Sequence, residues 1–442
     1  MIDRPDRLNE THDASRKSWI ESANSASTAF PIQNLPLGIF SPKDGHPRAG
    51  VAIGDQILDL ERCVDLGLID DIDRRWVDHD ALNSLLSQGE AVAGQLRRRL
   101  GNLLDMKGDL GQTLRRHEAD VLHVAADCAM HLPMHIGDFT DFFAGIYHAR
   151  TAGKFIRPDD PLPRNYKWVP IAYHSRASSV LPSGALLKRP MGQATDHLDG
   201  EPTFRPSRRL DIELELGMFV GLKSNLGERI PIAKASEHIA GYCLLNDWSA
   251  RDIQFWEMVP LGPFLGKNFG TTISPWIVTA EALRPFRIPA MARPQGDPRP
   301  LDYLWDDIDQ ATGGLAIDLE VRFSTAAMRD QGRTAEVVIT SNAKHLYWTP
   351  AQMVAHHTAG GCDLRTGDLI GSGTISGPTP NQLSSFLELT DGGTQAFALG
   401  NGETRTYLED GDQVELHGTC RREGFVPIGF GPCVGTILPA QM

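Results

Sequence analysis

The sequence predicts a mostly β protein of the α+β class with more than one domain. Alternating apolar and polar residues, as in 210–221 and 314–323, have the period of two that is typical of strands. Short strand-like runs alternate with turn residues along much of the chain. At 442 residues the chain is long enough for two to three domains and a large core.

The first 133 residues are expected to form an extension and a compact module. A short helix is expected over residues 13–23, around Trp19 and Ile20. Leucines three or four residues apart predict helical structure over 80–104 that covers a small sheet. The pattern breaks near residue 133, which divides the chain into an extension, a first domain and a second domain at 1–30, 31–133 and 134–442.

Beyond residue 133 the chain is expected to consist mostly of strands. Five prolines between residues 284 and 300 predict a loop. Thr349 and Pro350 form a typical helix start, and Gly360 and Gly361 a typical helix end.

Composition and charge narrow the class of protein. A formal net charge of −13 at pH 7 argues against nucleic acid or an anionic membrane as a partner, because both need a basic surface. Six cysteines without a C-x-x-C pair indicate a reduced, cytoplasmic protein. No apolar stretch reaches the ~18 residues of a membrane span. The basic run 97–99 is expected on a solvated helix face.

Three carboxylates lie two residues apart at Asp211, Glu213 and Glu215. In a strand this spacing puts all three on one face. Neighbouring carboxylates repel one another and are costly to bury, so the row either faces water or is neutralised by cations. Asp318 and Glu320 have the same spacing without comparable polar neighbours, and we expect that pair to be solvated.

Five longer blocks are more specific than any single spacing. They are IGDFTDFFAGIYHA at 136–149, AYHSRASS at 172–179, RPMGQ at 189–193, NDWSARDIQFWEMVPLGPFLGKNFGTTISPW at 246–276 and SGTISG at 372–377. Together they resemble the fumarylacetoacetate hydrolase family in its full-length, two-domain form. The resemblance implies a small SH3-like barrel before a larger β-roll catalytic domain, usually paired as a homodimer. It also implies a metal-dependent enzyme that hydrolyses a carbon–carbon bond in a β-diketone acid.

By this resemblance four carboxylates hold Ca²⁺ and/or Mg²⁺. The implied ligands are Asp141, Glu213, Glu215 and Asp247, with Lys267 and Thr271 beside a second, Mg²⁺-type site. An all-oxygen set suits a hard cation and not Zn²⁺. Because a charged lysine is an unsuitable ligand, we assign Lys267 as a charge neighbour. With Arg251 it would balance the charge of −2 that four carboxylates and one divalent cation leave.

Hydrolysis of a carbon–carbon bond needs an activated water, a place for the oxyanion and a stabilised carbanion. Histidine titrates near working pH, and His148 is the implied general base, oriented by Glu388. Asp141 precedes His148 by seven residues, which on a helix would return both side chains to one face. The implied oxyanion donors are Arg251, Gln254 and Lys267.

The implied substrate pocket departs from the family pattern. Its residues are Phe143, Arg157, Tyr173, Gln254, Met258 and Thr374. The family has tyrosines where this chain has Phe143 and Met258, so two hydroxyl donors are missing. Tyr147 is a candidate substitute, and Ser175 stands where the family usually has glycine.

The sequence leaves three functions open. The first is hydrolysis of fumarylacetoacetate to fumarate and acetoacetate, the last hydrolytic step of tyrosine and phenylalanine breakdown. The second is hydrolysis of a related acylpyruvate or other diketo acid, which Phe143 and Met258 favour. The third is a non-catalytic metal-binding protein of the same fold, against which the complete catalytic set speaks.

Overall fold

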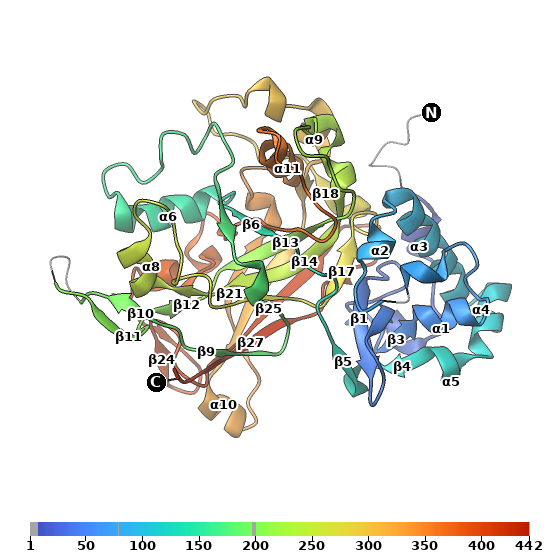
Figure 1. Cartoon of the computed structure of the whole chain (residues 1–442). Helices are drawn as coiled ribbons and strands as arrows, with labels where there is room; N and C mark the ends of the chain where they lie inside the picture. The colour runs from blue at the N-terminus through green and yellow to red at the C-terminus, as the bar shows by residue number, and fades with distance from the viewer. Residues whose placement is uncertain (1–7, 78, 197–199, 442) are drawn as a thin grey trace.

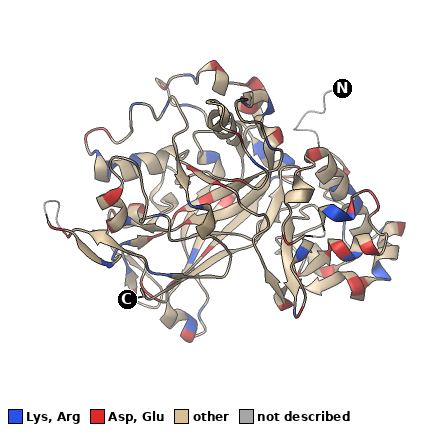
Figure 2. Cartoon of the chain, in the orientation of Figure 1, with Lys and Arg blue, Asp and Glu red and all other residues tan. Residues whose placement is uncertain are grey.

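The computed structural model describes residues 8–77, 79–196 and 200–441. The fold is mixed α/β with extensive sheets. Figure 1 shows the N-terminal part, in blue, beside a larger C-terminal part. In the view of Figure 2, acidic and basic segments are interspersed over both parts.

One sheet runs through both parts of the chain. Its main order is β4 (Leu122–Val124), β3 (Gln56–Asp59), β2 (Arg48–Ile53), β1 (Leu37–Pro42), β17 (Trp276–Thr279), β14 (Ile239–Asp247), β13 (Leu214–Val220), β22 (Leu369–Gly371), β6 (Phe139–Phe142) and β7 (Ala172–Ser175). Three further strands pair beside this path: β5 (Cys128–Met130) with β1, β16 (Thr271–Ile273) with β14, and β8 (Val180–Pro182) with β16.

The first module is therefore not a separate closed barrel in the described residues. β1 pairs with β2 along one edge, and with β17 and β5 along the other. The apolar core beneath it includes Phe219, Leu245 and Ile277 from the C-terminal part. Part of the second edge of β1 pairs with β17 of the C-terminal part. The strands of the first module therefore form an open run, and the expected SH3-like barrel is not seen in the described part of the chain. The β-roll stays a prediction.

A second sheet covers the C-terminal core. Its order is β21 (Glu336–Asn342), β20 (Asp318–Ser324), β25 (Gln413–Cys420), β27 (Cys433–Leu438) and β9 (Ala185–Lys188), with β26 (Ile428–Gly429) on β25. Trp248 and Trp348 are fully buried in that core. On β20, Asp318 is exposed and Glu320 half-exposed, as expected for a solvated pair.

The helices follow the sequence pattern with two exceptions. The longest helices are α3 (Glu90–Leu104), α6 (Ile146–Ile156) and α11 (Pro350–Thr358). Residues 80–104 divide into α2 (Asn83–Leu86) and α3 at Gly89, whose φ of 80° interrupts the helix. Residues 13–20 form no helix, because Ser18 bridges to Asp105, and only the 3₁₀ helix Glu21–Asn24 overlaps the end of the predicted range. None of the helices in residues 8–77, 79–196 and 200–441 is long and apolar enough to cross a membrane.

Helix α11 begins and ends as its sequence predicts. Thr349 accepts a hydrogen bond from the Gln352 backbone N–H, and the Gln352 side chain accepts one from the Thr349 backbone N–H. Gly361 then ends the segment with φ of 91°. Of the proline-rich segment, residues 289–300 form the loop, whereas 284–288 form a turn and a short strand.

The basic run on α3 is not uniformly solvated. Arg97 is buried, and its guanidinium donates to the carbonyl oxygens of Gln33 and Asn34 and to Thr11 Oγ1. The extension that contains Thr11 also reaches the C-terminal part, because His12 Nε2 lies 2.9 Å from the carbonyl oxygen of Glu281. The extension, whose described portion begins at residue 8, thus packs against both parts.

Replacing Arg97 with Met should lower the free energy of unfolding by about 3 kcal/mol, because two buried carbonyl groups lose a charged donor. Denaturant titration measures the change. Arg98→Met is the matched control: Arg98 is partly exposed and lies 3.5 Å from Glu10, and its loss should change stability by less than about 0.5 kcal/mol. Equal losses in the two variants would contradict this account of Arg97.

Candidate active site and metal centre

Three strands of one sheet bring the predicted metal ligands together. Asp141 lies on β6, Glu213 directly before β13, Glu215 on β13 and Asp247 at the end of β14. Each offers an oxygen within 4.8 Å of the others, and all four side chains are buried. Asp211, Glu213 and Glu215 are all buried, so the interpretation that this row of carboxylates faces water is wrong.

The three-carboxylate row is divided by a break in the strand. Asp211 ends β12 (Leu210–Asp211), β13 begins at Leu214, and the Glu213 backbone N–H donates to Asn246 Oδ1 at 3.1 Å. Glu213 and Glu215 join the cluster, whereas Asp211 makes a different set of contacts. The spacing of two residues predicted that all three carboxylates share one face of a strand. Because the strand is broken between Asp211 and Leu214, only Glu213 and Glu215 lie in the cluster.

A glycine on the strand between two ligand strands allows the carboxylates to meet. Gly371 is on β22, which pairs with β6 on one side and β13 on the other. A Cβ atom there would lie 2.3 Å from Asp141 Oδ1 and 3.2 Å from Glu215 Oε2. The missing side chain provides the space in which the two carboxylates converge.

Asp247 is held by three donors. Lys267 Nζ lies 2.8 Å from its Oδ2 and 2.5 Å from Glu213 Oε2. Tyr173 OH donates to Oδ2 at 2.7 Å, and Thr271 Oγ1 donates to Oδ1 at 3.1 Å. Lys267 thus neutralises the cluster through two carboxylates, as its assignment as a charge neighbour requires.

The charges of the cluster are unequally compensated. Burial, followed by the charge of Asp247, raises the pKa of Asp141 well above its ordinary value, and burial with the charge of Asp141 does the same for Glu215. Burial would also raise the pKa of Glu213, but Lys267 and Arg251 outweigh it and hold that pKa below its ordinary value. Two of the four carboxylates therefore favour a proton or a cation.

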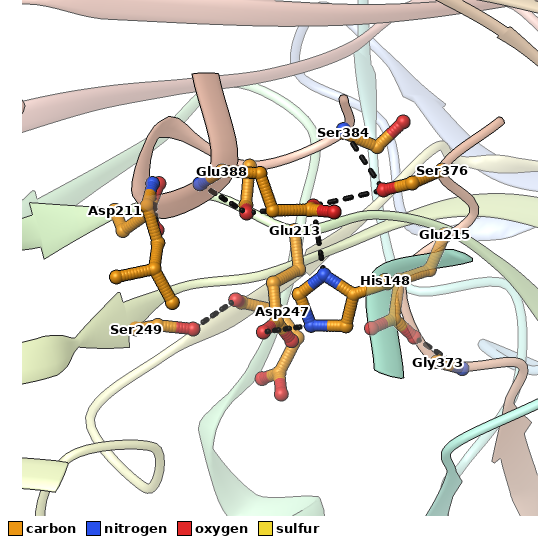
Figure 3. A network of polar contacts seen from close by, with 12 residues as sticks. His148, Asp211, Glu213, Glu215, Asp247, Ser249, Gly373, Ser376, Ser384 and Glu388 are labelled. Atoms are coloured by element: carbon orange, nitrogen blue, oxygen red, sulfur yellow. Dashed lines mark hydrogen bonds and ion pairs between the residues drawn. The ribbon is translucent and has the colours of Figure 1, made fainter. Parts of the chain in front are cut away.

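His148 lies between the cluster and a second carboxylate (Figure 3). Its Nδ1 is 2.7 Å from Glu388 Oε2, and its Nε2 is 3.6 Å from Glu213 Oε1. A carboxylate only accepts, so Nδ1 donates to Glu388, and Nε2 faces the cluster. His148 and Asp141 do not share a helix, because Asp141 is on β6 and His148 on α6, and residues 143–145 separate these elements.

Two serines bind the same oxygen of Glu388 that faces His148. Ser376 Oγ and Ser385 Oγ donate to Glu388 Oε2 at 2.8 and 2.9 Å. The serine hydroxyls gave no signal in the sequence, because serine is common in turns. They are functional candidates that only the three-dimensional arrangement reveals.

Arg251 faces the same site from α8 (Arg251–Glu257). Its Nη1 lies 2.9 Å from Glu213 Oε1 and donates to Gln254 Oε1 at 3.1 Å. Burial lowers the pKa of Arg251, but Asp211 and Glu213 outweigh it, and the pKa is raised. Arg251 is therefore a fixed cation, and Gln254 is held beside it.

Five buried polar atoms of this region have no hydrogen-bond partner among the described residues. They are Asp141 Oδ1, Glu215 Oε1, Arg251 Nη2, Glu388 Oε1 and Thr374 Oγ1. Unpaired buried polar atoms are costly, so their concentration here indicates groups that bind a cation or a substrate. Two carboxylate oxygens within one all-oxygen cluster fit a divalent cation.

The expected substrate residues are placed unevenly. Phe143 packs edge-on against the His148 ring, with centroids 5.6 Å apart, and Met258 is half-buried at the end of α8. Arg157 is exposed and donates to the Pro161 carbonyl oxygen at 3.0 Å, so it is not brought to the cluster. Tyr147 packs against His345 and not against His148, which argues against it as a substitute donor.

Comparison with known proteins decides the family. The model described as "Fumarylacetoacetase N-terminal" matches residues 33–133, and "Fumarylacetoacetate (FAA) hydrolase C-terminal" matches residues 139–438. The chain belongs to the fumarylacetoacetate hydrolase family. The resemblance of the five sequence blocks to this family is thereby confirmed.

Curated fumarylacetoacetases match this chain over nearly its whole length. It is 46% identical to the fumarylacetoacetase of Homo sapiens over 93% of this chain and 97% of that protein. It is 45% identical to that of Dictyostelium discoideum over 96% of this chain and 98% of that protein. A solved structure of a putative HpcE protein from Mycobacterium smegmatis covers 91% of this chain and 99% of that one, with a TM-score of 0.50 and 16% identity, and shows a similar fold.

Replacing Glu215 with Gln should weaken Ca²⁺ binding by at least about 10-fold, because one charged oxygen ligand is lost from the cluster. Isothermal titration with Ca²⁺ measures the affinity. Glu320→Gln, on the solvated strand with the same spacing, should bind as the wild type does. An unchanged affinity in Glu215→Gln would remove this carboxylate from the metal centre.

Binding of Ca²⁺ should release protons. The raised pKa values of Asp141 and Glu215 mean that the metal-free site holds protons which a cation must displace, so the apparent affinity should fall as pH falls. The same titration in two buffers of different ionisation enthalpy measures the release. Identical heats in both buffers would contradict the expected displacement.

Proposed function

We propose that this enzyme hydrolyses fumarylacetoacetate to fumarate and acetoacetate. The observation that carries the proposal is His148 held between Glu388 and a buried four-carboxylate cluster, in a chain 46% identical to a fumarylacetoacetase over 93% of its length. A silent metal-binding relative would have no need of an oriented base beside the cluster. The non-catalytic alternative is therefore rejected.

We assign a divalent cation, Ca²⁺ or Mg²⁺, to Asp141, Glu213, Glu215 and Asp247. The all-oxygen set and the two orphaned carboxylate oxygens support a hard cation. When bound, such an ion supplies Lewis acidity toward the carbonyl oxygens of a 1,3-diketone. Lys267 and Thr271 hold Asp247 in place and complete its surroundings.

His148 acts as the general base. Glu388 accepts from Nδ1 and thereby fixes the tautomer, so Nε2 can take a proton from water as the oxygen attacks the fumaryl carbonyl carbon. The tetrahedral intermediate then collapses, and the bond between that carbon and the adjacent methylene carbon breaks. The hydroxyl of the water stays on the fumaryl carbon as part of the new carboxylate. The proton taken from the water ends on the methylene carbon of the acetoacetate fragment, which becomes a methyl group.

Arg251, Gln254 and Lys267 stabilise negative charge during the reaction. Arg251 Nη2 is buried and unpaired, which suits a donor to the tetrahedral oxyanion. Gln254 is held beside Arg251, and Lys267 is close enough to the cluster to favour the enolate or to protonate carbon. Such donors typically contribute about 3 to 4 kcal/mol each when aimed at developing charge.

We assign Tyr173, Thr374 and Arg157 to substrate binding, although Tyr173 OH here donates to Asp247 and Arg157 to the Pro161 carbonyl oxygen. Thr374 Oγ1 is buried without a partner and follows Gly373, whose N–H donates to Glu215 at 3.0 Å. Phe143 and Met258 favour a second candidate substrate, a shorter acylpyruvate, because each replaces a hydroxyl donor of the family pattern with an apolar group.

We further propose a cytoplasmic homodimer. The six cysteines are all free among the described residues, which suits a reducing compartment. Several large apolar side chains are exposed around the end of α8, among them Val259, Leu261 and Phe264, and a second copy would cover them.

Replacing His148 with Asn should lower kcat by about 10²- to 10⁴-fold with little change in Ca²⁺ content, because the base is lost and the ligands stay. The loss of diketone absorbance gives the rate. His131→Asn, in the N-terminal part where His131 lies 2.8 Å from Ser41 Oγ, should keep wild-type activity. Full turnover by His148→Asn would remove this histidine as the base.

The preferred substrate can be tested by comparing kcat/KM for fumarylacetoacetate and a shorter acylpyruvate. We expect fumarylacetoacetate to be preferred, and Met258→Tyr to improve its kcat/KM by roughly 10-fold through one restored hydroxyl donor. A clear preference for the acylpyruvate would assign the second candidate substrate.

A further inference from the structure

Asp211 is the one member of the three-carboxylate row that does not join the metal centre. It is fully buried, and both of its oxygens are used. Oδ1 accepts from the backbone N–H groups of Phe386 and Ile212 at 2.6 and 2.7 Å. Oδ2 accepts from Arg251 Nε at 2.8 Å and from the Leu387 backbone N–H at 3.0 Å.

One branch of these contacts leads to the candidate oxyanion donor. The Asp211 carboxylate binds Arg251 through Nε, which leaves Nη1 directed at Glu213 Oε1 at 2.9 Å and Nη2 unpaired. A planar guanidinium held at one edge by a charged partner has a fixed orientation. Asp211 therefore determines where the unpaired Nη2 points.

The other branch leads to the residue that orients the base. Phe386 and Leu387 are the first two residues of α12 (Phe386–Leu389), the short turn that also contains Glu388. Glu388 in turn accepts from His148 Nδ1 at 2.7 Å. Figure 3 shows Asp211 against this turn, with Glu388 and His148 on its other side.

We propose that Asp211 is a positioning residue that fixes the oxyanion donor Arg251 relative to the Glu388–His148 pair. The inference rests on the proposed function, since it assigns Asp211 a part in that reaction. Asp211 touches neither metal ligand oxygens nor reacting atoms. It connects the proposed oxyanion donor on α8 with α12, which contains the residue that orients the base.

A neutral side chain at position 211 can distinguish this role from simple support of the turn. An asparagine amide oxygen could still accept from Phe386 and Ile212, so these two contacts need only an oxygen at that place. The second position faces Arg251 Nε and the Leu387 backbone N–H, where an asparagine NH₂ group would oppose two donors. Asp211→Asn therefore removes the arginine branch and one of the two N–H contacts from α12, and keeps the other.

We expect Asp211→Asn to lower kcat for fumarylacetoacetate by about 10²-fold, with KM changed by less than about 3-fold, because a misdirected donor affects the transition state more than substrate binding. Asp59→Asn is the matched control. Asp59 is also fully buried, lies 2.7 Å from Arg48 Nε and accepts from the Arg62 backbone N–H at 3.0 Å, but it is in the N-terminal part. Its variant should lose comparable thermal stability and keep wild-type kcat.

A double-mutant cycle tests whether Asp211 acts through Arg251. In an Arg251→Met background, Asp211→Asn should lower kcat by less than about 3-fold further, because the donor that it positions is gone. Costs that multiply, or a wild-type kcat in Asp211→Asn, would overturn the proposal. If Asp211→Asn does not fold, Asp211→Glu retains the charge and shifts the guanidinium, and the same loss of kcat is expected.

A crystal structure of Asp211→Asn with Ca²⁺ gives a readout independent of turnover. The Arg251 guanidinium should leave its place beside Glu213 Oε1, now 2.9 Å from Nη1, and an unmoved guanidinium would overturn the proposal. A wild-type enzyme that turns over no diketone would instead overturn the proposed function. The two failures are therefore distinguishable.

Discussion

The structure depends on the burial of four carboxylates in one place. Lys267 and Arg251 supply two positive charges against four negative ones, and the raised pKa values of Asp141 and Glu215 report the deficit. A site of this kind is incomplete without protons or a cation. The strands bring the carboxylates together, and α8 and the turn before β16 bring the compensating cations Arg251 and Lys267.

Glu213 connects the metal centre to the groups assigned to the chemistry. Its two oxygens face Lys267 on one side, and Arg251 and His148 on the other. A change at any of these partners therefore alters the charge seen by a bound cation. The carboxylate cluster, His148 and Arg251 therefore form one electrostatic unit, built from side chains of several separate elements.

Sequence reasoning predicted the buried carboxylate cluster better than the fold. Its four members were predicted because the blocks that contain Asp141 and Asp247 match a family, and the N-terminal cap of α11 was predicted because Thr349 and Pro350 are a local signal. The shared edge of β1 was not predicted, because pairing between distant strands leaves no local pattern. For the same reason Gly371 gave no signal: its value lies in the two carboxylates that pass over it.

The extension has a consequence for how the molecule is divided. The N-terminal family match begins at residue 33, yet Thr11 contacts Arg97, and His12 contacts Glu281 in the C-terminal part. A truncation made at the start of that match would expose the buried Arg97 and remove the contact that His12 makes with the C-terminal part. The smallest self-sufficient unit of this protein thus begins well before its first recognisable domain.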